Sequence, residues 1–289
     1  MLTIFTDTDT DITKKDADYL GLKLISMPYT IDGNTVYPYE DWETFDSHEF
    51  YEKLRNGTLP KTSSISEEKY IEYFRPVFEK GDDIFYIHFS RNMSATFDAM
   101  DKAVKRLLDE FPKRKFYEVD TEGISALSYS IVKDVVEKLK SGTSPEKVVD
   151  WAKDEIKHYA LYFFADDLKF FKQSGRVSNL AGTVGTILGI RPIIYVNDEG
   201  KMVSIGKEKG RFKAAERLIQ YVDDLGTAIK DHRIIIASSD NEGLVNEIKT
   251  RLIEKYGEGL KIEFVTVNPT IGAHCGPDAV GICFYADHR

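Results

Sequence analysis

The chain has 289 residues, of which 42% are hydrophobic and 30% are charged, and its formal net charge is −9. This is the composition of an ordinary soluble globular protein, and the length favours two domains. The negative charge argues against nucleic acid as a partner, because phosphate binding needs concentrated Lys and Arg, and it does not favour an anionic membrane surface.

Targeting signals and membrane spans are not expected. No apolar run approaches the length of a membrane span, and the first residues lack the basic and apolar segments of a signal peptide. The two cysteines, Cys275 and Cys283, make neither a disulfide framework nor a zinc site. We therefore predict a cytoplasmic protein with free thiols and no integral membrane segment.

A short apolar strand begins the chain and is followed by the acidic residues Asp7, Asp9 and Asp11. A calcium loop is excluded, because Ile12 and Asp18 occupy positions that need Gly and Glu. The pattern Asp-x-Asp-x-Thr from Asp9 matches an aspartyl nucleophile of the haloacid-dehalogenase kind. This match leaves open the possibility that the protein is a Mg²⁺-dependent phosphatase that uses Asp7 or Asp9. The favoured interpretation is a turn in which Asp caps the next helix.

The following segment contains a hydroxyl-rich run, Thr62, Ser63, Ser64 and Ser66, just before a helix. Such a run is either ordinary loop chemistry or a source of hydrogen-bond donors. Around it we expect strands at 23–27 and 35–37 and helices at 13–20, 46–55 and 67–79.

A strand at 83–89 leads through a polar turn into an amphipathic helix that ends near Phe111. Ser94 stands where an N-cap is expected. Free N–H groups, a hydroxyl and the positive end of the helix dipole would suit a carboxylate or phosphate there. The alternative is that Ser94 only caps its helix.

The remainder alternates helices and strands, which predicts an α/β fold, and a domain boundary is expected near 155–165. We divide the chain into 1–160 and 161–289. Ser178 is expected to cap a helix through Ile187 that contains Gly182 and Gly185 and ends near Gly189; the gaps left by these glycines either admit a ligand or allow close packing. Helices are expected at 125–140, 145–157, 167–172, 212–225 and 244–256, and strands at 115–119, 159–165, 192–196, 202–206, 233–237, 261–267 and 279–285.

Several ordered segments together resemble the DegV family. They are Thr6-Asp7-Thr8, Lys61-Thr62-Ser63, Ser94-Ala95-Thr96, Ser174-Gly175-Arg176-Val177-Ser178, Arg191-Pro192-Ile193, Lys207-Glu208-Lys209-Gly210-Arg211 and His274-Cys275-Gly276-Pro277-Asp278-Ala279-Val280-Gly281. The resemblance covers nearly the whole chain. It implies two α/β domains with a lipid-binding cavity between them and a bound long-chain fatty acid such as palmitate (hexadecanoate). It implies no enzymatic activity and no cofactor.

By the same resemblance, the protein is bacterial and presents the acid's carboxylate to a separate fatty acid kinase subunit, or otherwise carries the acid in lipid metabolism. Thr62 and Ser94 are the expected carboxylate ligands, assisted by Ser63 and His274. The residue His274 could instead satisfy backbone groups in a Gly-rich turn, and a thiol nucleophile at its neighbour Cys275 is discounted because no acid partner is placed.

Two arginines and one substitution complete the expected site. Arg176 and Arg211 either compensate the head-group charge, or meet the partner, or form surface ion pairs. The family's usual Ser-Gly-Thr has Ala95 in place of Gly, which adds a methyl near the head group. A Gln-Pro that usually follows Thr62-Ser63 is also missing. Acyl chain length, unsaturation and oligomeric state are not predicted.

Overall fold

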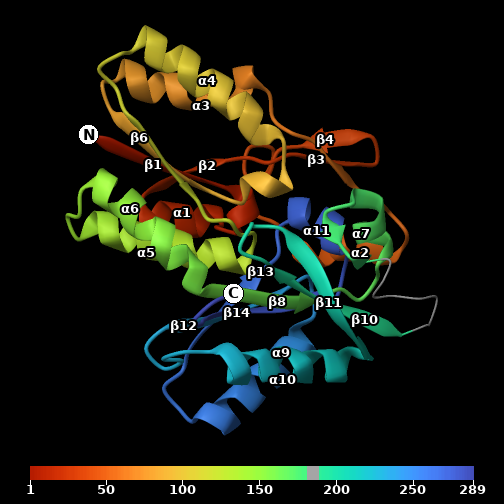
Figure 1. Cartoon of the computed structure of the whole chain (residues 1–289). Helices are drawn as coiled ribbons and strands as arrows, with labels where there is room; N and C mark the ends of the chain where they lie inside the picture. The colour runs from red at the N-terminus through yellow and green to blue at the C-terminus, as the bar shows by residue number, and fades with distance from the viewer. Residues whose placement is uncertain (181–188) are drawn as a thin grey trace.

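The computed structural model describes residues 1–180 and 189–289 (Figure 1). The strands are β1 Leu2–Asp7, β2 Leu22–Ile25, β3 Tyr29–Ile31, β4 Asn34–Val36, β5 Lys61–Thr62, β6 Asp83–His88, β7 Phe116–Asp120, β8 Tyr159–Phe164, β9 Val177–Ser178, β10 Ile190–Val196, β11 Met202–Lys209, β12 Arg233–Ser238, β13 Lys261–Thr266 and β14 Val280–Tyr285. The α-helices are α1 Lys14–Leu20, α2 Ser47–Arg55, α3 Glu67–Glu79, α4 Thr96–Glu110, α5 Ala126–Lys140, α6 Pro145–Glu155, α7 Lys169–Ser174, α9 Arg211–Leu225, α10 Glu242–Tyr256 and α11 Pro269–Cys275, with 3₁₀ turns η1 Thr8–Thr10, η2 Arg91–Met93 and η3 Ile156–His158.

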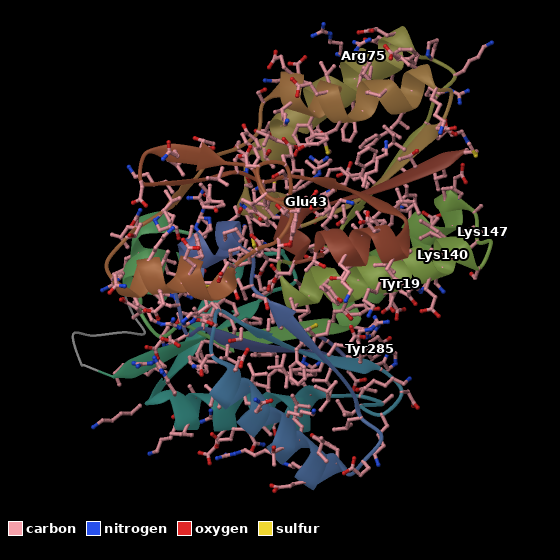
Figure 2. All side chains as sticks on the ribbon, turned by 180° about the vertical axis from the view of Figure 1, so that it is seen from behind. Tyr19, Glu43, Arg75, Lys140, Lys147 and Tyr285 are labelled. Carbon is pink, nitrogen blue, oxygen red and sulfur yellow. The ribbon has the colours of Figure 1, made fainter. Side chains whose placement is uncertain are left out.

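A parallel four-stranded sheet forms the N-terminal layer, in the order β2-β1-β6-β7. Helices α3 and α4 cover one face, and α1, α5 and α6 lie on the other (Figure 1). Because both faces are covered, the central strand β6 is an almost continuous apolar run that is buried from Ile84 to His88. Lys140 and Lys147, at the ends of α5 and α6, point into solvent (Figure 2).

A mixed seven-stranded sheet forms the C-terminal layer, in the order β13-β12-β14-β8-β10-β11-β9. Helices α9 and α10 cover its outer face (Figure 1), and α5 packs on the inner face against β8, β12 and β14. Since α5 also contacts β6, it lies between the two sheets, and its first half, residues 126–132, is buried on all sides. The division into 1–160 and 161–289 stays a prediction, because this helix of the first half packs on both sheets.

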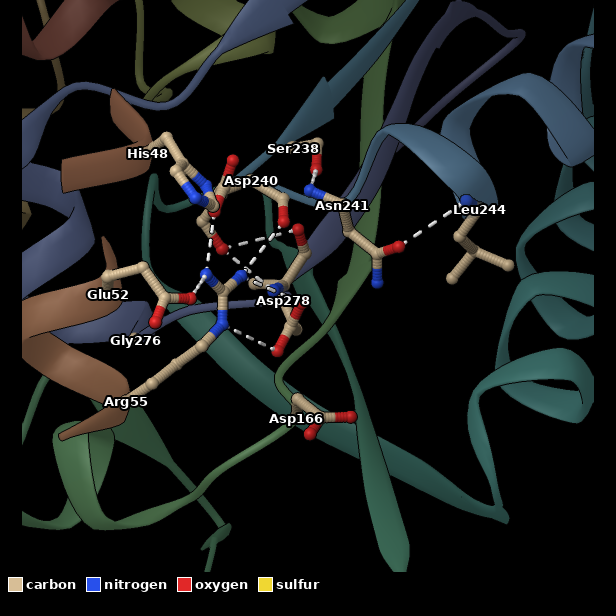
Figure 3. Close-up of polar contacts among 12 residues, drawn as sticks. His48, Glu52, Arg55, Asp166, Ser238, Asp240, Asn241, Leu244, Gly276 and Asp278 are labelled. Carbon is tan, nitrogen blue, oxygen red and sulfur yellow. Dashed lines mark hydrogen bonds and ion pairs between the residues drawn. The ribbon is translucent and has the colours of Figure 1, made fainter. Parts of the chain in front are cut away.

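A small antiparallel sheet, β4-β3-β5, packs with α2 and α11 beside the two main sheets. At the end of α2, Arg55 joins this region to the C-terminal layer (Figure 3). Its guanidinium donates to the Asp240 carboxylate at 2.7 Å and to the Asp278 carboxylate at 3.1 Å. A bidentate pattern to two carboxylates fixes the position of α2 as well as contributing charge pairing.

The mixed α/β fold is confirmed, and most predicted helices are present within a few residues. Local capping explains this success: Thr13 forms a capping box on α1, and the side chains of Asp46 and Ser66 cap α2 and α3. The favoured interpretation of the acidic run needs correction, because Asp7 caps only η1 and the cap of α1 is Thr13.

Three further expectations differ from the structure. Ser94 is not the N-cap of α4; Ala95 takes that position, and Ser94 closes the preceding 3₁₀ turn. Ser178 belongs to the short strand β9. The segment with Gly182 and Gly185 that was predicted to be helical through Ile187 lies outside the described residues. Finally, α11 lies between the strands predicted at 261–267 and 279–285, where no helix is predicted.

Candidate functional site

A deep cavity lies where the two main sheets, the small sheet and α11 meet. About 1110 Å³ of space there is not occupied by protein atoms, a volume that includes open solvent at the mouth. The apolar part of its wall is made by Met27, Phe89, Met93, Ile124, Leu161, Phe163, Phe171, Met202, Ala237, Val267, Ile271, Ala279 and Val280. Its polar part is made by Asp9, Thr62, Ser63, Ser64, Ser94, Ser125, Arg176, Thr270 and His274, with Cys275 and Gly281 completing the wall. A cavity with apolar walls and a few grouped polar side chains suits an amphiphilic small molecule.

The cavity runs across the inner face of the seven-stranded sheet. Its wall includes Ala237 on β12, Leu161 on β8 and Met202 on β11. Since β12 and β11 are separated by four inter-strand steps in the sheet order, the lined face is about 19 Å wide, taking about 4.8 Å per step.

Thr62 and His274 form the polar centre of the wall. The pairing of β5 with β3 places Thr62 opposite Tyr29, and His274 lies in the last turn of α11. The Thr62 hydroxyl and the His274 Nε2 are 3.1 Å apart, within hydrogen-bond distance. This contact joins residues that are far apart in the sequence, and it directs a hydroxyl and an imidazole at the same part of the cavity.

The imidazole of His274 is neutral at pH 7. Burial lowers its pKa to about 4, and the nearby Arg176 guanidinium contributes in the same direction. Its buried Nδ1 has no hydrogen-bond partner among the described residues. A neutral imidazole keeps one N–H donor, so His274 has hydrogen-bonding capacity that the protein alone leaves unused.

Ser94 and Ser63 border the same cavity from neighbouring loops. The Ser94 hydroxyl oxygen accepts a hydrogen bond from the Thr96 backbone N–H at 3.3 Å, and no residue that the structure describes accepts the Ser94 proton. Ala95 is exposed and does not line the cavity, although it replaces the Gly expected from the family resemblance. Its side chain also leaves the first turn of α4 without a side-chain cap.

The two candidate arginines are placed differently. Arg176 lines the cavity and donates to the Ser174 carbonyl oxygen. Arg211 is outside the cavity wall, where it donates to the Asp166 carboxylate at 2.7 and 2.9 Å and to Asp278 at 3.0 Å. A positive charge at the cavity therefore comes from Arg176.

Asp7, the first carboxylate of the acidic run, is already engaged within the fold. Asp7 is fully buried; it accepts hydrogen bonds from the Tyr86 hydroxyl and the Phe89 N–H, and burial raises its pKa to about 7. Among the described residues, the group whose ligand atoms lie close enough to share a metal is elsewhere, at His48, Glu52 and Asp240. Arg55 already pairs with both carboxylates of that group.

Sequence reasoning found the hydroxyls and His274 but missed Asp9 as a cavity residue, and also Ser125 and Thr270. Asp9 was considered only for catalysis. The signal that could have found Ser125 and Thr270 is their position at the starts of α5 and α11, at the end of a loop. The apolar wall had no separate signal, because its residues have the same pattern as the core.

These features define an α/β protein built on two main sheets, with a cavity between them that suits an amphiphile. The sequence matches the family model described as "Uncharacterised protein, DegV family" over residues 1–287, and the chain belongs to the DegV family. The family resemblance seen in the sequence is thereby confirmed. A DegV domain-containing protein of Clostridium perfringens is 29% identical over 287 residues, covering 99% of this chain and 98% of the relative.

Solved structures show the same fold. A DegV family protein from Thermus thermophilus, described as fatty acid binding, has a TM-score of 0.85 and 25% identity, with 99% of both chains covered. A stearic acid-binding protein from Eubacterium ventriosum has a TM-score of 0.86 and 19% identity, covering 99% of this chain and 98% of the other. Neither is described as an enzyme. Among the described helices, none is both long and apolar enough to cross a bilayer.

Proposed function

We propose that this protein binds a long-chain fatty acid, with the alkyl chain in the cavity and the carboxylate at Thr62, Ser63, Ser94 and His274, and that it catalyses no reaction. The observation that carries the proposal is that one cavity joins an apolar wall to the Thr62–His274 pair. The fatty-acid-binding relative from Thermus thermophilus supports it through a shared fold at 25% identity.

The energetics assign different roles to the two ends of the ligand. Each buried CH₂ contributes about 0.8 kcal/mol, so about fifteen of them give a gross gain of about 12 kcal/mol. A hydrogen bond to a charged group contributes about 1.5–3 kcal/mol. The chain therefore supplies most of the affinity, while the hydroxyls and the imidazole fix the carboxylate. Without such donors, burial of the carboxylate would be costly.

The proposal also includes a place in metabolism. The carboxylate would be presented to a kinase partner for phosphorylation, and the acid would be palmitate-like. Arg176 is suited to offset the head-group charge because it lines the cavity. Arg211, held by Asp166 and Asp278 outside the wall, is suited to contact a partner instead. A cytoplasmic location fits the two free cysteines, Cys275 and Cys283.

Lipid extraction from the purified protein, followed by mass spectrometry, tests the binding directly. We expect a co-purifying long-chain acid that is released on denaturation. Lipid-free protein that takes up no fatty acid, or that releases phosphate from esters in a metal-dependent way, would overturn the proposal.

Two substitutions test the head-group assignment. Thr62→Val and Ser94→Ala should each weaken fatty-acid binding about tenfold or more, since each removes a donor to a charged group. The matched controls are Thr250→Val and Ser141→Ala, which remove hydroxyls from an exposed position within α10 and from the exposed C-cap of α5. Affinities that are unchanged in both cavity variants would reject the assignment while leaving the cavity as the binding site.

A further inference from the structure

Asp9 is a buried carboxyl group in the cavity wall that the proposed head-group site does not use. The residue is 7% exposed, and its Oδ1 is buried without a hydrogen-bond partner among the described residues. Its neighbours differ in this respect. Asp7 accepts from Tyr86 and Phe89, and Asp11 accepts from the Ser125 hydroxyl and from Asn268.

Burial raises the pKa of Asp9 well above its ordinary range, and the adjacent carboxyls of Asp7 and Asp11 raise it further, while the Asn268 side chain acts in the opposite direction. The protonated form of the Asp9 carboxyl is therefore favoured. A protonated carboxyl carries one O–H donor and keeps acceptor capacity on its other oxygen. A buried polar group without a partner destabilises the complex, so a ligand that satisfies Asp9 should bind more tightly than one that does not.

The position of Asp9 differs from that of the head-group donors. Asn268, which caps the start of α11, donates to the backbone oxygen of Thr8, next to Asp9, and to Asp11. His274 lies six residues further along the same helix, which is about 9 Å at 1.5 Å per residue. Asp9 is therefore level with the start of α11, while Thr62 and His274 are level with its end. A ligand held at His274 would pass Asp9 with its chain and not with its carboxylate.

The wall near Asp9 contains other polar groups whose protons are already committed. The Ser125 hydroxyl donates to Asp11, and the Thr270 hydroxyl donates to the Met27 carbonyl oxygen at 2.7 Å. Both hydroxyl oxygens can still accept a hydrogen bond. A ligand hydroxyl group at the level of Asp9 could therefore both donate and accept a hydrogen bond, whereas a methylene group could do neither.

We propose that Asp9 forms a second polar subsite, and that the preferred ligand is a long-chain acid with a hydroxyl group on its chain. The ligand hydroxyl would donate to one oxygen of Asp9 and accept from the other, while the alkyl segments on either side contact the apolar wall. This inference rests on the proposed fatty-acid function and specifies the class of acid.

The test compares stearic acid with hydroxystearic acids that carry the hydroxyl near the carboxyl end, at mid-chain or near the methyl end. Dissociation constants would be measured by calorimetry for the wild-type protein, Asp9→Asn and Asp9→Ala. For the wild type we expect one positional isomer to bind about tenfold or more tightly than stearic acid. Asp9→Asn should keep a preference for that isomer, because an amide also donates and accepts. Asp9→Ala should bind stearic acid at least as well as the hydroxy acid.

The possible failures can be distinguished. If stearic acid binds as well as every isomer, the subsite is wrong and the proposed function stands; a water molecule on Asp9 in the stearate complex would account for that result. If no acid binds, the proposed function fails as well. The wild-type comparison requires no substitution, so a poorly folded Asp9→Ala protein would not prevent a decision. Circular dichroism of both variants checks that they are folded.

Discussion

A leucine in place of Ala237 would test whether the alkyl chain occupies the cavity. Ala237 is on β12, is 4% exposed, and lines the cavity at the end of the lined sheet face that lies farthest from β11. The substitution adds roughly three methylene equivalents to the wall, which removes space for about that many carbons of the ligand. At about 0.8 kcal/mol per buried CH₂, an acid that fills the cavity should lose about 2.4 kcal/mol of binding free energy, or roughly 50-fold in affinity.

The assay is a series of saturated acids of increasing chain length, with dissociation constants measured for the wild type and for Ala237→Leu. We expect short acids to bind both proteins alike and long acids to bind the variant more weakly, so that the preferred chain length becomes shorter. Thr62→Val is the matched comparison, because loss of a head-group donor should weaken every acid by the same factor. A uniform loss in Ala237→Leu, or no loss at any length, would refute the assignment of this wall to the chain.

Three further predictions concern protonation and packing. The pKa of the buried Asp7 carboxyl is raised from 3.8 to about 7, so Asp7 binds more protons in the folded than in the unfolded state. The stability of the wild type should therefore fall relative to that of Asp7→Asn as pH rises from 4 to 7, by up to about 1.4 kcal/mol per pH unit. Urea unfolding of both proteins measures this difference in stability, and a difference that does not change with pH would contradict the prediction. In the ligand-free protein the NMR signals of His274 should remain those of a neutral ring down to about pH 5, because the pKa of His274 is about 4. A bound carboxylate should raise the midpoint of this titration. A midpoint near 6.5 without ligand would show that the ring is not buried as described. Gly272→Ala would place the added methyl group 2.6 Å from the Tyr51 hydroxyl oxygen and should destabilise the fold by about 1–3 kcal/mol. Gly243→Ala is the control and should not destabilise the fold, because the space around Gly243 is open. Equal thermal unfolding midpoints for the two variants would contradict the packing of α11.

The parts of the fold that follow from nearby residues could be predicted from the sequence. The helices that begin after Thr13, Asp46 and Ser66 were expected near their observed bounds, because their caps are local hydrogen bonds. The helix α11 was missed because it is short, contains Gly272 and has no amphipathic repeat. The strand β5 was missed because it has only two residues and depends on its pairing with β3.

The candidate site could be predicted only where residues carry recognisable chemistry. Thr62, Ser94 and His274 stood out because their motifs resemble a known family, and the structure brings them to one cavity. Leu161 and Ala237 also line that cavity, but their apolar pattern is that of any buried strand. Whether such residues face a neighbour or an empty space depends on how the two sheets are spaced, and this is a property of the whole fold.

Helix α5 contacts both sheets, and the two residues just before its start, Ile124 and Ser125, border the cavity. An alkyl chain in this space would complete the packing between the layers, so part of the protein's interior would be supplied by the cell's lipid pool. Ligand occupancy and folding would then be linked, because a molecule that binds only the folded state stabilises it. The amount of folded protein that accumulates in a cell would consequently follow the supply of acyl chains.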